Sequence, residues 1–416
     1  MTERFVVVGG GLAGARTARE LRNKGFTGEI DLVCAEEIPP YERPPLSKDY
    51  LAGAVTSEEF LVQPREWYAE HGVRLRLGTR ASAVYPTSHR VELADGTVLD
   101  YDRLVLATGS RPRRLPLPGA DARGVHCLRR LGDADRLRET LRRIRRLVVI
   151  GAGWIGLEVA AVARNQGVQV CVVENAPTPL AAALGPRMGE VFADLHREHG
   201  VDLRLSNRVS EIHSRGGVTG VRTVDGADIP ADAVLVAVGA RPEIALAADA
   251  GLDVGEGVLV DTGMTTSDPD ILAVGDIAET RHPVLGRIRV EHWANALKQP
   301  RVAAATMLGE AAAHTEVPYF FTDQYDLGME YHGRVPDGVE DRVLVRGNLS
   351  SRRFVAFWLD GDNRVWAGMN VNVFDVSRSV RALVESGQPV DPRRLVDTTH
   401  PLEELAASHE RNVNPV

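Results

Sequence analysis

The stretch FVVVGGGLAG, residues 5–14, decides the fold that we expect for this chain. A β-branched run ends in glycines at positions 9, 11 and 14, the spacing GxGxxG, and the following ARTARELRNKG favours a helix that Gly25 ends. In such a unit the first glycine allows a tight turn, and the second lets a pyrophosphate approach the backbone. The third lets helix and strand pack closely. The helix amino terminus then offers N–H groups to phosphates.

The same pattern occurs a second time, in LVVIGAGWIG at residues 147–156. Its glycines are Gly151, Gly153 and Gly156, and the helix that follows ends at Gly167. A lone GxGxxG is a weak signal, because glycine-rich turns also serve packing alone. Two copies in one chain favour two bound dinucleotides.

Each glycine turn is followed by a second strand that ends in an acid, Glu36 in the first unit and Glu174 in the second. A carboxylate at this place accepts hydrogen bonds from the ribose hydroxyls of a dinucleotide. An acid rather than an arginine at position 174 favours NADH over NADPH.

Three further strands end in glycine turns. LVLATGSRPRRLP (104–116) and VLVAVGARPE (234–243) each follow a segment that we interpret as a hairpin. ILAVGDIAE ends a strand at Gly275 and Asp276. Asp276 could cap a helix, but its surroundings make a ligand hydroxyl the better partner.

The composition is that of a globular protein. The chain has 416 residues, 44% of them hydrophobic and 25% charged, which predicts about three domains. The net charge of −8 argues against a nucleic-acid partner. The start MTERFVVV leaves no room for a signal segment, and the longest apolar stretch, 147–163, is short for a membrane span. We therefore expect a cytoplasmic protein.

The three cysteines, Cys34, Cys127 and Cys171, are far apart and form no CxxC or CxxxxC pair. A disulfide framework, a zinc site and an iron–sulfur cluster all lack their ligands. The sequence predicts no metal site.

Eight motifs in order carry a resemblance over nearly the whole chain: GGGLAG, YERPPLSK, ATGSRPR, GAGWIGLEVA, VAVGARP, AVGDIA, VEHWANA and DQYDLGMEYHG. The chain resembles the NADH-dependent ferredoxin reductases that serve cytochrome P450s and ring dioxygenases, a branch of the pyridine nucleotide-disulfide oxidoreductase superfamily. The resemblance implies an α/β fold with two Rossmann-like dinucleotide-binding domains of the glutathione-reductase type and a C-terminal α+β interface domain.

The resemblance also implies domain boundaries. A discontinuous FAD-binding domain would comprise residues 1–112 and 242–316, an NAD-binding domain residues 113–241, and the C-terminal domain residues 317–416. In the sequence itself, EAAAHTEVPYFFTDQYD (310–326) predicts an alanine-rich helix followed by an aromatic strand. RVLVRGN, RFVAFWLD and RVWAGMNVN then alternate as strands, and DVSRSVRALVESG predicts a helix that Gly387 ends.

The site residues follow from the resemblance, position by position. The FAD-binding residues would be Gly9, Gly11, Leu12, Ala13, Gly14, Glu36, Arg43, Pro45, Lys48, Ala107, Thr108, Gly109, Arg111, Asp276, Glu291, His292, Trp293 and Phe321. The NAD-binding residues would be Gly151, Gly153, Trp154, Ile155, Gly156, Glu158, Glu174 and Gly239. The resemblance also places Lys48 beside the flavin, paired with Glu158, as the catalytic residues.

The chemistry of several of these residues also relates to their expected roles. The planar guanidinium of Arg43 suits a pyrophosphate. Glu158 lies in what we expect to be the first turn of an apolar helix, where a buried carboxylate needs a positive partner or a helix dipole. Trp293 is either a flavin-site residue or a core tryptophan. The chain departs from the family pattern at Thr178, Ala182, Pro300 and Phe321.

The leading hypothesis is an electron-transfer flavoenzyme that uses FAD and NADH and reduces a [2Fe–2S] ferredoxin, as a monomer or weak homodimer. A reductase that passes electrons through sulfur would need a cysteine near the flavin, and the chain has none at the required positions. A rubredoxin reductase, and a redox-responsive protein like apoptosis-inducing factor, stay open as alternatives. We expect no nucleic-acid or membrane partner.

Overall fold

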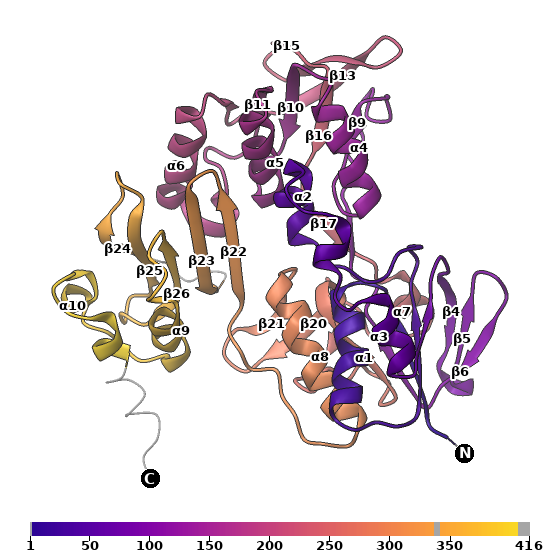
Figure 1. The fold of residues 1–416 in the computed structure, drawn as a ribbon. Coiled ribbons are helices and arrows are strands. Elements are labelled where there is room, and N and C mark those ends of the chain that lie inside the picture. Colours follow the sequence, from indigo (N-terminus) through magenta and orange to yellow (C-terminus); the bar gives the residue numbers. More distant parts are fainter. Residues whose placement is uncertain (1, 337–341, 407–416) are drawn as a thin grey trace. The chain divides into compact units, whose positions relative to one another are not determined.

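The computed structural model describes residues 2–336 and 342–406 and divides into two compact units (Figure 1). The first unit consists of Met1–Arg43, Thr56–Arg111 and Arg241–Tyr319, and the second of Pro44–Val55, Pro112–Ala240 and Phe320–Val416. This division differs from the three predicted domains, which stay a prediction. The part of the third domain at 337–341 and 407–416 lies outside the described residues.

The first unit is built on a parallel five-stranded sheet. Its strands, in spatial order, are β19 (Ile271–Ala273), β7 (Arg103–Leu106), β1 (Arg4–Val8), β2 (Glu29–Val33) and β3 (Val73–Arg76). The three strands β19, β7 and β1 are nearly continuous buried apolar runs, as expected where both faces of a sheet are covered, whereas the edge strand β3 alternates apolar residues with arginines. The chain winds from β1 to one side through β2 and β3, and later returns to the other side of β1. Ligands of open α/β sheets bind at such a switch point.

Helices and small sheets complete the first unit. Helices α1 (Leu12–Asn23) and α8 (Trp293–Met307) pack against each other (Figure 1). Pro300 lies inside α8. The remaining elements are α3 (Arg65–Glu70), α7 (Ala245–Asp249), the sheet of β4 (Ala81–Tyr85), β5 (Arg90–Leu93) and β6 (Val98–Asp100), and the sheet of β18 (Val258–Val260), β20 (Ala278–His282) and β21 (Gly286–Arg289).

The second unit repeats this parallel topology. The strands are, in spatial order, β12 (Asp202–Arg204), β11 (Gln169–Val173), β10 (Arg146–Ile150), β16 (Ala233–Val236) and β9 (Val125–His126). They are accompanied by α4 (Leu131–Leu141), α5 (Trp154–Asn165), α6 (Ala181–Glu198) and the antiparallel strands β13 (Val209–Ser214), β14 (Val218–Thr223) and β15 (Asp228–Pro230). Two short paired strands, β8 (Ser110–Pro112) and β17 (Ala240–Pro242), lie where the chain passes from one unit to the other.

The C-terminal part of the second unit is a five-stranded sheet in which the register of the central pairs is antiparallel. In spatial order its strands are β22 (Tyr319–Gln324), β23 (Leu327–Gly333), β26 (Val365–Val371), β25 (Arg353–Leu359) and β24 (Arg342–Asn348). Helix α9 (Ser377–Ser386) packs on β26 and β23, and α10 (Pro392–Val396) packs on β24. With two parallel dinucleotide-type sheets and this α+β part, the predicted fold class is confirmed.

Residues 44–55 belong to the second unit although their neighbours on both sides belong to the first. The segment forms a 3₁₀ turn, Pro44–Ser47, and the short helix α2 (Asp49–Ala52), and it packs on α4 and α5. The Tyr50 hydroxyl donates to Asp135 Oδ1 over 2.5 Å. The Arg138 guanidinium lies 4.6 Å from the centre of the Tyr50 ring.

The prediction of an alanine-rich helix before Pro318 in the segment 310–326 is wrong. Helix α8 ends at Met307, and the residues from 310 to 318 are not helical. Gly309 has a φ of 78°, which ends the helix, and three alanines before a proline are too few to start another. No helix among the described residues is both long enough and apolar enough to cross a membrane.

Candidate functional site

The glycine turn of the first unit lies between the central strand β1 and helix α1. A Cβ atom at Gly9 would lie 2.1 Å from the carbonyl oxygen of Ala107, and one at Gly14 would lie 1.9 Å from that of Gly9. The protein's own packing therefore requires both glycines. Gly11 is different, because the nearest described atom to its missing Cβ is Arg43 Nη2, 3.9 Å away. The space over Gly11 fits a phosphate that the Arg43 guanidinium can also reach.

The glycine turn of the second unit has the same design. A Cβ at Gly151 would lie 2.5 Å from the carbonyl oxygen of Ala237, and one at Gly156 would lie 2.2 Å from that of Gly151. No described atom lies within 4 Å of a Cβ built on Gly153. In both turns, then, the middle glycine leaves open space that the fold does not need, as expected where a pyrophosphate approaches the backbone.

The two acids predicted to hold ribose hydroxyls lie at these turns. Glu36 follows β2, accepts a 2.8 Å hydrogen bond from the Tyr41 hydroxyl and lies 3.7 Å from Arg43 Nη2. Glu174 follows β11 and accepts a 2.6 Å hydrogen bond from the backbone N–H of Ala152, inside the second glycine turn. Each carboxylate is thus held beside the turn of its own unit.

The ends of β7 and β19 complete the first turn's surroundings. Thr108 and Gly109 follow β7, and Thr108 Oγ1 donates to the carbonyl oxygen of Glu243 over 2.8 Å. Gly275 and Asp276 follow β19, and a Cβ at Gly275 would lie 3.0 Å from the Cβ of Ala13, the second residue of α1. The structure therefore brings the predicted FAD-binding residues 9, 11–14, 107–109 and 276 to one end of one sheet.

The amino terminus of α8 holds three further predicted residues. His292 is the N-cap, and Trp293 donates from Nε1 to Glu42 Oε2 over 3.0 Å. Glu291 Oε1 lies 2.5 Å from Arg289 Nη1. Trp293 is partly exposed, so it is not a fully buried core residue.

Lys48 and Glu158 meet in the second unit, Nζ to Oε1, at 2.6 Å. The Glu158 side chain is only 5% exposed. It also accepts hydrogen bonds from Ser47 Oγ, 2.5 Å from Oε2, and from Thr322 Oγ1, 2.6 Å from Oε1. One ammonium and two hydroxyls thus satisfy a carboxylate that would be costly to bury alone.

The expected position of Glu158 in the first turn of its helix is wrong. Helix α5 begins at Trp154, so Glu158 is its fifth residue and lies in the second turn. The helix dipole acts mainly within the first turn. Lys48, rather than the dipole, is therefore the main positive partner of this carboxylate.

The remaining predicted residues lie as follows. Phe321, Pro45 and Lys48 all belong to the second unit. The ring centre of Phe321, in β22, lies 5.6 Å from Lys48 Nζ. Trp154 packs on Phe320 with ring centres 4.3 Å apart, whereas the neighbouring Ile155 is 42% exposed. The last two predicted residues are Arg111 and Gly239. Arg111 forms an ion pair with Glu243 at 3.3 Å, and the carbonyl oxygen of Gly239 accepts a 2.9 Å hydrogen bond from the backbone N–H of Arg113.

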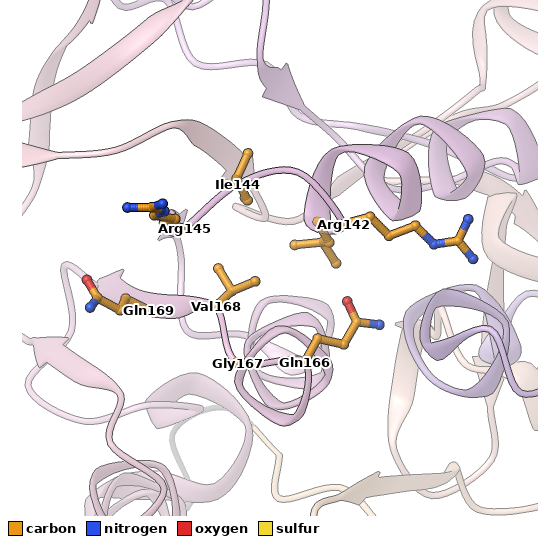
Figure 2. A pocket seen from close by; sticks show the side chains of 8 residues that line it. Arg142, Ile144, Arg145, Gln166, Gly167, Val168 and Gln169 are labelled. Atoms are coloured by element: carbon orange, nitrogen blue, oxygen red, sulfur yellow. The ribbon is translucent and has the colours of Figure 1, made fainter.

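A hollow of about 500 Å³ in the second unit (Figure 2) is lined by none of these residues. It is lined by the segment before β10, including Arg142, Ile144 and Arg145, and by the segment 166–169 at the start of β11. These are the amino ends of the parallel strands, whereas dinucleotides bind at the carboxyl ends. The hollow is therefore not the dinucleotide site.

The sequence reasoning missed Ser47 and Thr322 as partners of Glu158. They are 111 and 164 residues away from it along the chain. Neither spacing nor periodicity could pair them. One signal in the sequence was that each is the neighbour of a predicted residue, Lys48 or Phe321.

Comparison with known families decides what this arrangement is. Residues 3–300 match the model of the pyridine nucleotide-disulphide oxidoreductases. The chain belongs to this family. Residues 319–406 match a second model, described as a reductase C-terminal domain. Members of the family bind FAD and NAD(H), which the two open glycine turns fit.

Full-length relatives in the family carry specific names. The chain is 39% identical to rhodocoxin reductase of Rhodococcus erythropolis, with 98% of this chain and 95% of that protein covered. It is 40% identical to the ferredoxin–NAD(+) reductase component of the anthranilate 1,2-dioxygenase system of Burkholderia cepacia, with 95% and 97% covered. The solved covalent putidaredoxin reductase–putidaredoxin complex contains a chain 39% identical, with a TM-score of 0.94 over 98% of this chain and 99% of that one. The resemblance stated above is confirmed.

Proposed function

We propose that the chain is an FAD-dependent NADH:ferredoxin oxidoreductase that passes electrons to a [2Fe–2S] ferredoxin of a cytochrome P450 or ring dioxygenase. The first unit would bind FAD and the second NADH. The observation that carries the proposal is the pair of glycine turns, each with an open middle glycine and a carboxylate held beside it. The names of the full-length relatives support the choice of acceptor.

When bound, FAD supplies a group that accepts a hydride from NADH and gives up electrons singly. The residues of the chain bind and orient. The backbone at Gly11 and the guanidinium of Arg43 would hold the FAD pyrophosphate, and Glu36 the adenosine ribose. Glu174 would hold the ribose of NADH. The Lys48–Glu158 pair holds one positive charge in a largely buried position. We propose that these two residues are the catalytic pair for flavin reduction.

The test is a steady-state assay with NADH against a panel of ferredoxins and rubredoxins. Rapid reduction of cytochrome c only when a ferredoxin is added supports the proposal. Activity with rubredoxins alone favours a rubredoxin reductase. Slow turnover with every acceptor, together with a stable complex of reduced enzyme and NAD, favours a redox-responsive protein like apoptosis-inducing factor. A cytoplasmic location and a monomer or weak homodimer stay predictions.

NADH is expected to be preferred over NADPH by about tenfold or more in kcat/KM, because the Glu174 carboxylate repels a 2′-phosphate. Backbone N–H groups of Ala152 and Ala176 hold this carboxylate in place, 2.6 and 2.8 Å from its oxygens. The measurement is kcat/KM for both coenzymes in wild type and in Glu174→Gln, which keeps the shape and removes the charge. Equal values for the two coenzymes in wild type contradict the assignment.

Ferredoxin-dependent turnover is expected to fall several-fold between about 0.05 and 0.5 M salt, over which the screening length shrinks roughly threefold. At a net charge of −8, only local positive charge can steer an acidic ferredoxin. The exposed arginines that could provide this local charge are Arg113, Arg114, Arg353, Arg393 and Arg394. Arg352 is less suited, because it pairs with Glu198 at 2.6 Å.

The control for this salt dependence is the reduction of ferricyanide by NADH in the same buffers. A small acceptor does not need the exposed arginines, so its rate should change little. Equal responses of both activities to salt contradict docking through these arginines.

A further inference from the structure

Behind Glu158 lies a row of buried polar side chains in the second unit. Thr322 of β22 and His196 of α6 are 0% exposed, and Gln324 of β22 is 1% exposed. Gln324 Nε2 lies 3.2 Å from Thr322 Oγ1, and Gln324 Oε1 lies 2.9 Å from His196 Nε2. Thr322 in turn bonds to Glu158 at 2.6 Å, so the row runs from helix α6 through β22 to helix α5.

The direction of every hydrogen bond in this row follows from its end at Glu158. The Glu158 carboxylate accepts from Lys48, so its oxygens are acceptors, and the single hydroxyl proton of Thr322 must point to it. Thr322 Oγ1 can then only accept from Gln324, which must present its NH₂ group. The carbonyl oxygen of Gln324 therefore faces His196, and His196 must donate from Nε2.

The surroundings of His196 agree with this direction. Burial lowers the pKa of His196 to about 4, so the ring is neutral at pH 7 and carries one proton. Its Nδ1 atom has no hydrogen-bond partner within the described part of the chain. A proton on Nδ1 would leave a buried donor unpaired, whereas a proton on Nε2 meets the Gln324 carbonyl oxygen.

A row of buried polar side chains does not stabilise a core more than apolar side chains would. Apolar side chains of the same shape would pack at least as well, and a buried polar group costs free energy whenever one of its bonds is missing. What the row supplies is orientation, because His196 donates to Gln324, Gln324 donates to Thr322, and Thr322 donates to one carboxylate oxygen of Glu158. That oxygen, Oε1, is the one that also holds Lys48.

We propose that Thr322, oriented by Gln324 and His196, is a positioning residue that fixes Glu158 and through it the Lys48 ammonium for flavin reduction by NADH. This inference rests on the function proposed above. Thr322 and Gln324 lie in the C-terminal sheet, so a strand outside both parallel sheets helps to set the geometry of the catalytic pair.

The first test compares Thr322→Val, which removes the hydroxyl at constant shape, with Thr322→Ser, which keeps it. In stopped-flow experiments the limiting rate of flavin reduction should fall about tenfold in Thr322→Val, as for one lost hydrogen bond to a charged group. The Kd for NADH and the FAD content should stay near wild type, and Thr322→Ser should recover the rate to within about twofold. Equal slowing in both variants overturns the proposal, because the hydroxyl is then not what matters.

A double-variant cycle shows whether Thr322 acts through Glu158. In a Glu158→Gln background, Thr322→Val should cause no further slowing, because the carboxylate that it orients is gone. A full tenfold further loss in this background contradicts a positioning role. A merely structural role would instead lower the melting temperature of all Thr322→Val proteins alike without changing the rate.

The second test needs no electron acceptor and no turnover. The ¹⁵N chemical shifts of the histidine rings in the oxidised holoenzyme report which nitrogen carries the proton. We expect the proton of His196 on Nε2 in wild type and Thr322→Ser. In Thr322→Val the Gln324 amide is free to turn over, so a population with the proton on Nδ1 should appear.

His199 is an internal control for this measurement. Its Nδ1 atom lies 2.8 Å from the carbonyl oxygen of Leu195, so it carries a proton on Nδ1 and should not respond to changes at Thr322. A wild-type His196 with its proton on Nδ1 overturns the proposal even if Thr322→Val does not fold. Failure of every ferredoxin as acceptor would instead refute the proposed function and leave this NMR result unchanged.

Discussion

Lys48→Ala is expected to slow the reduction of bound flavin by NADH by about 100-fold or more while the enzyme keeps its FAD. Three described side chains donate to Glu158, those of Ser47, Lys48 and Thr322, and of these only Lys48 is charged; the Glu158 side chain is 5% exposed. Removing one partner of a buried ion pair costs about 3–5 kcal/mol, because the remaining charge is left uncompensated. Because the pair is proposed to act in flavin reduction, a cost of about 3 kcal/mol in the activation free energy of that step slows it by about 100-fold or more.

The measurement is stopped-flow reduction at saturating NADH, with FAD content read from the absorbance of the purified enzyme. Lys24→Ala is the matched control, since Lys24 also forms an ion pair, 2.5 Å from Glu310, but a more exposed one in the first unit. An unchanged rate in Lys48→Ala removes Lys48 from the catalytic residues. Loss of FAD without slowing of the remaining holoenzyme makes Lys48 a structural clamp instead.

Gly11→Ala and Gly153→Ala are each expected to weaken the binding of a different cofactor. An added Cβ at either position meets no close atom of the fold, and φ is −92° at Gly11 and −79° at Gly153, which any residue adopts. The methyl group would instead occupy the space of a pyrophosphate, and overpacking of about 1–3 kcal/mol corresponds to roughly a 5- to 150-fold loss of affinity. Gly11→Ala should weaken FAD binding, and Gly153→Ala should raise the Kd for NADH with FAD retained.

Gly361→Ala is the control for this pair, because no described atom lies near its missing Cβ and it lies in a turn remote in sequence from both motifs. It should change neither affinity. Equal melting temperatures of the apoproteins would confirm that the substitutions leave the fold intact. Retained FAD in Gly11→Ala together with lost NADH binding would mean that the cofactors are assigned to the wrong turns.

Local patterns were sufficient for much of this fold. The β-branched runs and the glycine spacing predicted strands β1 and β10 and helices α1 and α5, because these depend on neighbours within a few residues. The C-terminal strands β24, β25 and β26 and helix α9 followed from alternation and from Gly387 in the same way.

The partners of Glu158 could not be predicted in this way, because they depend on tertiary packing of distant segments. One available signal was not used. Thr322 and Gln324 alternate in β22 and are both buried, so two polar side chains point to the inner face of an aromatic strand. Polar residues in such places need partners, and that requirement could have led to the row behind Glu158.

The arrangement of the chain in the two parallel sheets has a consequence for how the protein is made. The sheet around β1 lacks its edge strand β19 until residue 273 has left the ribosome, although the chain begins in that sheet. The sheet around β10 uses only residues 125–236, so it has all its strands earlier, even though its first strand is synthesised later. The nascent chain can therefore complete the sheet around β10 first, and for some time it carries an open β7 edge that chaperones or premature pairing can reach.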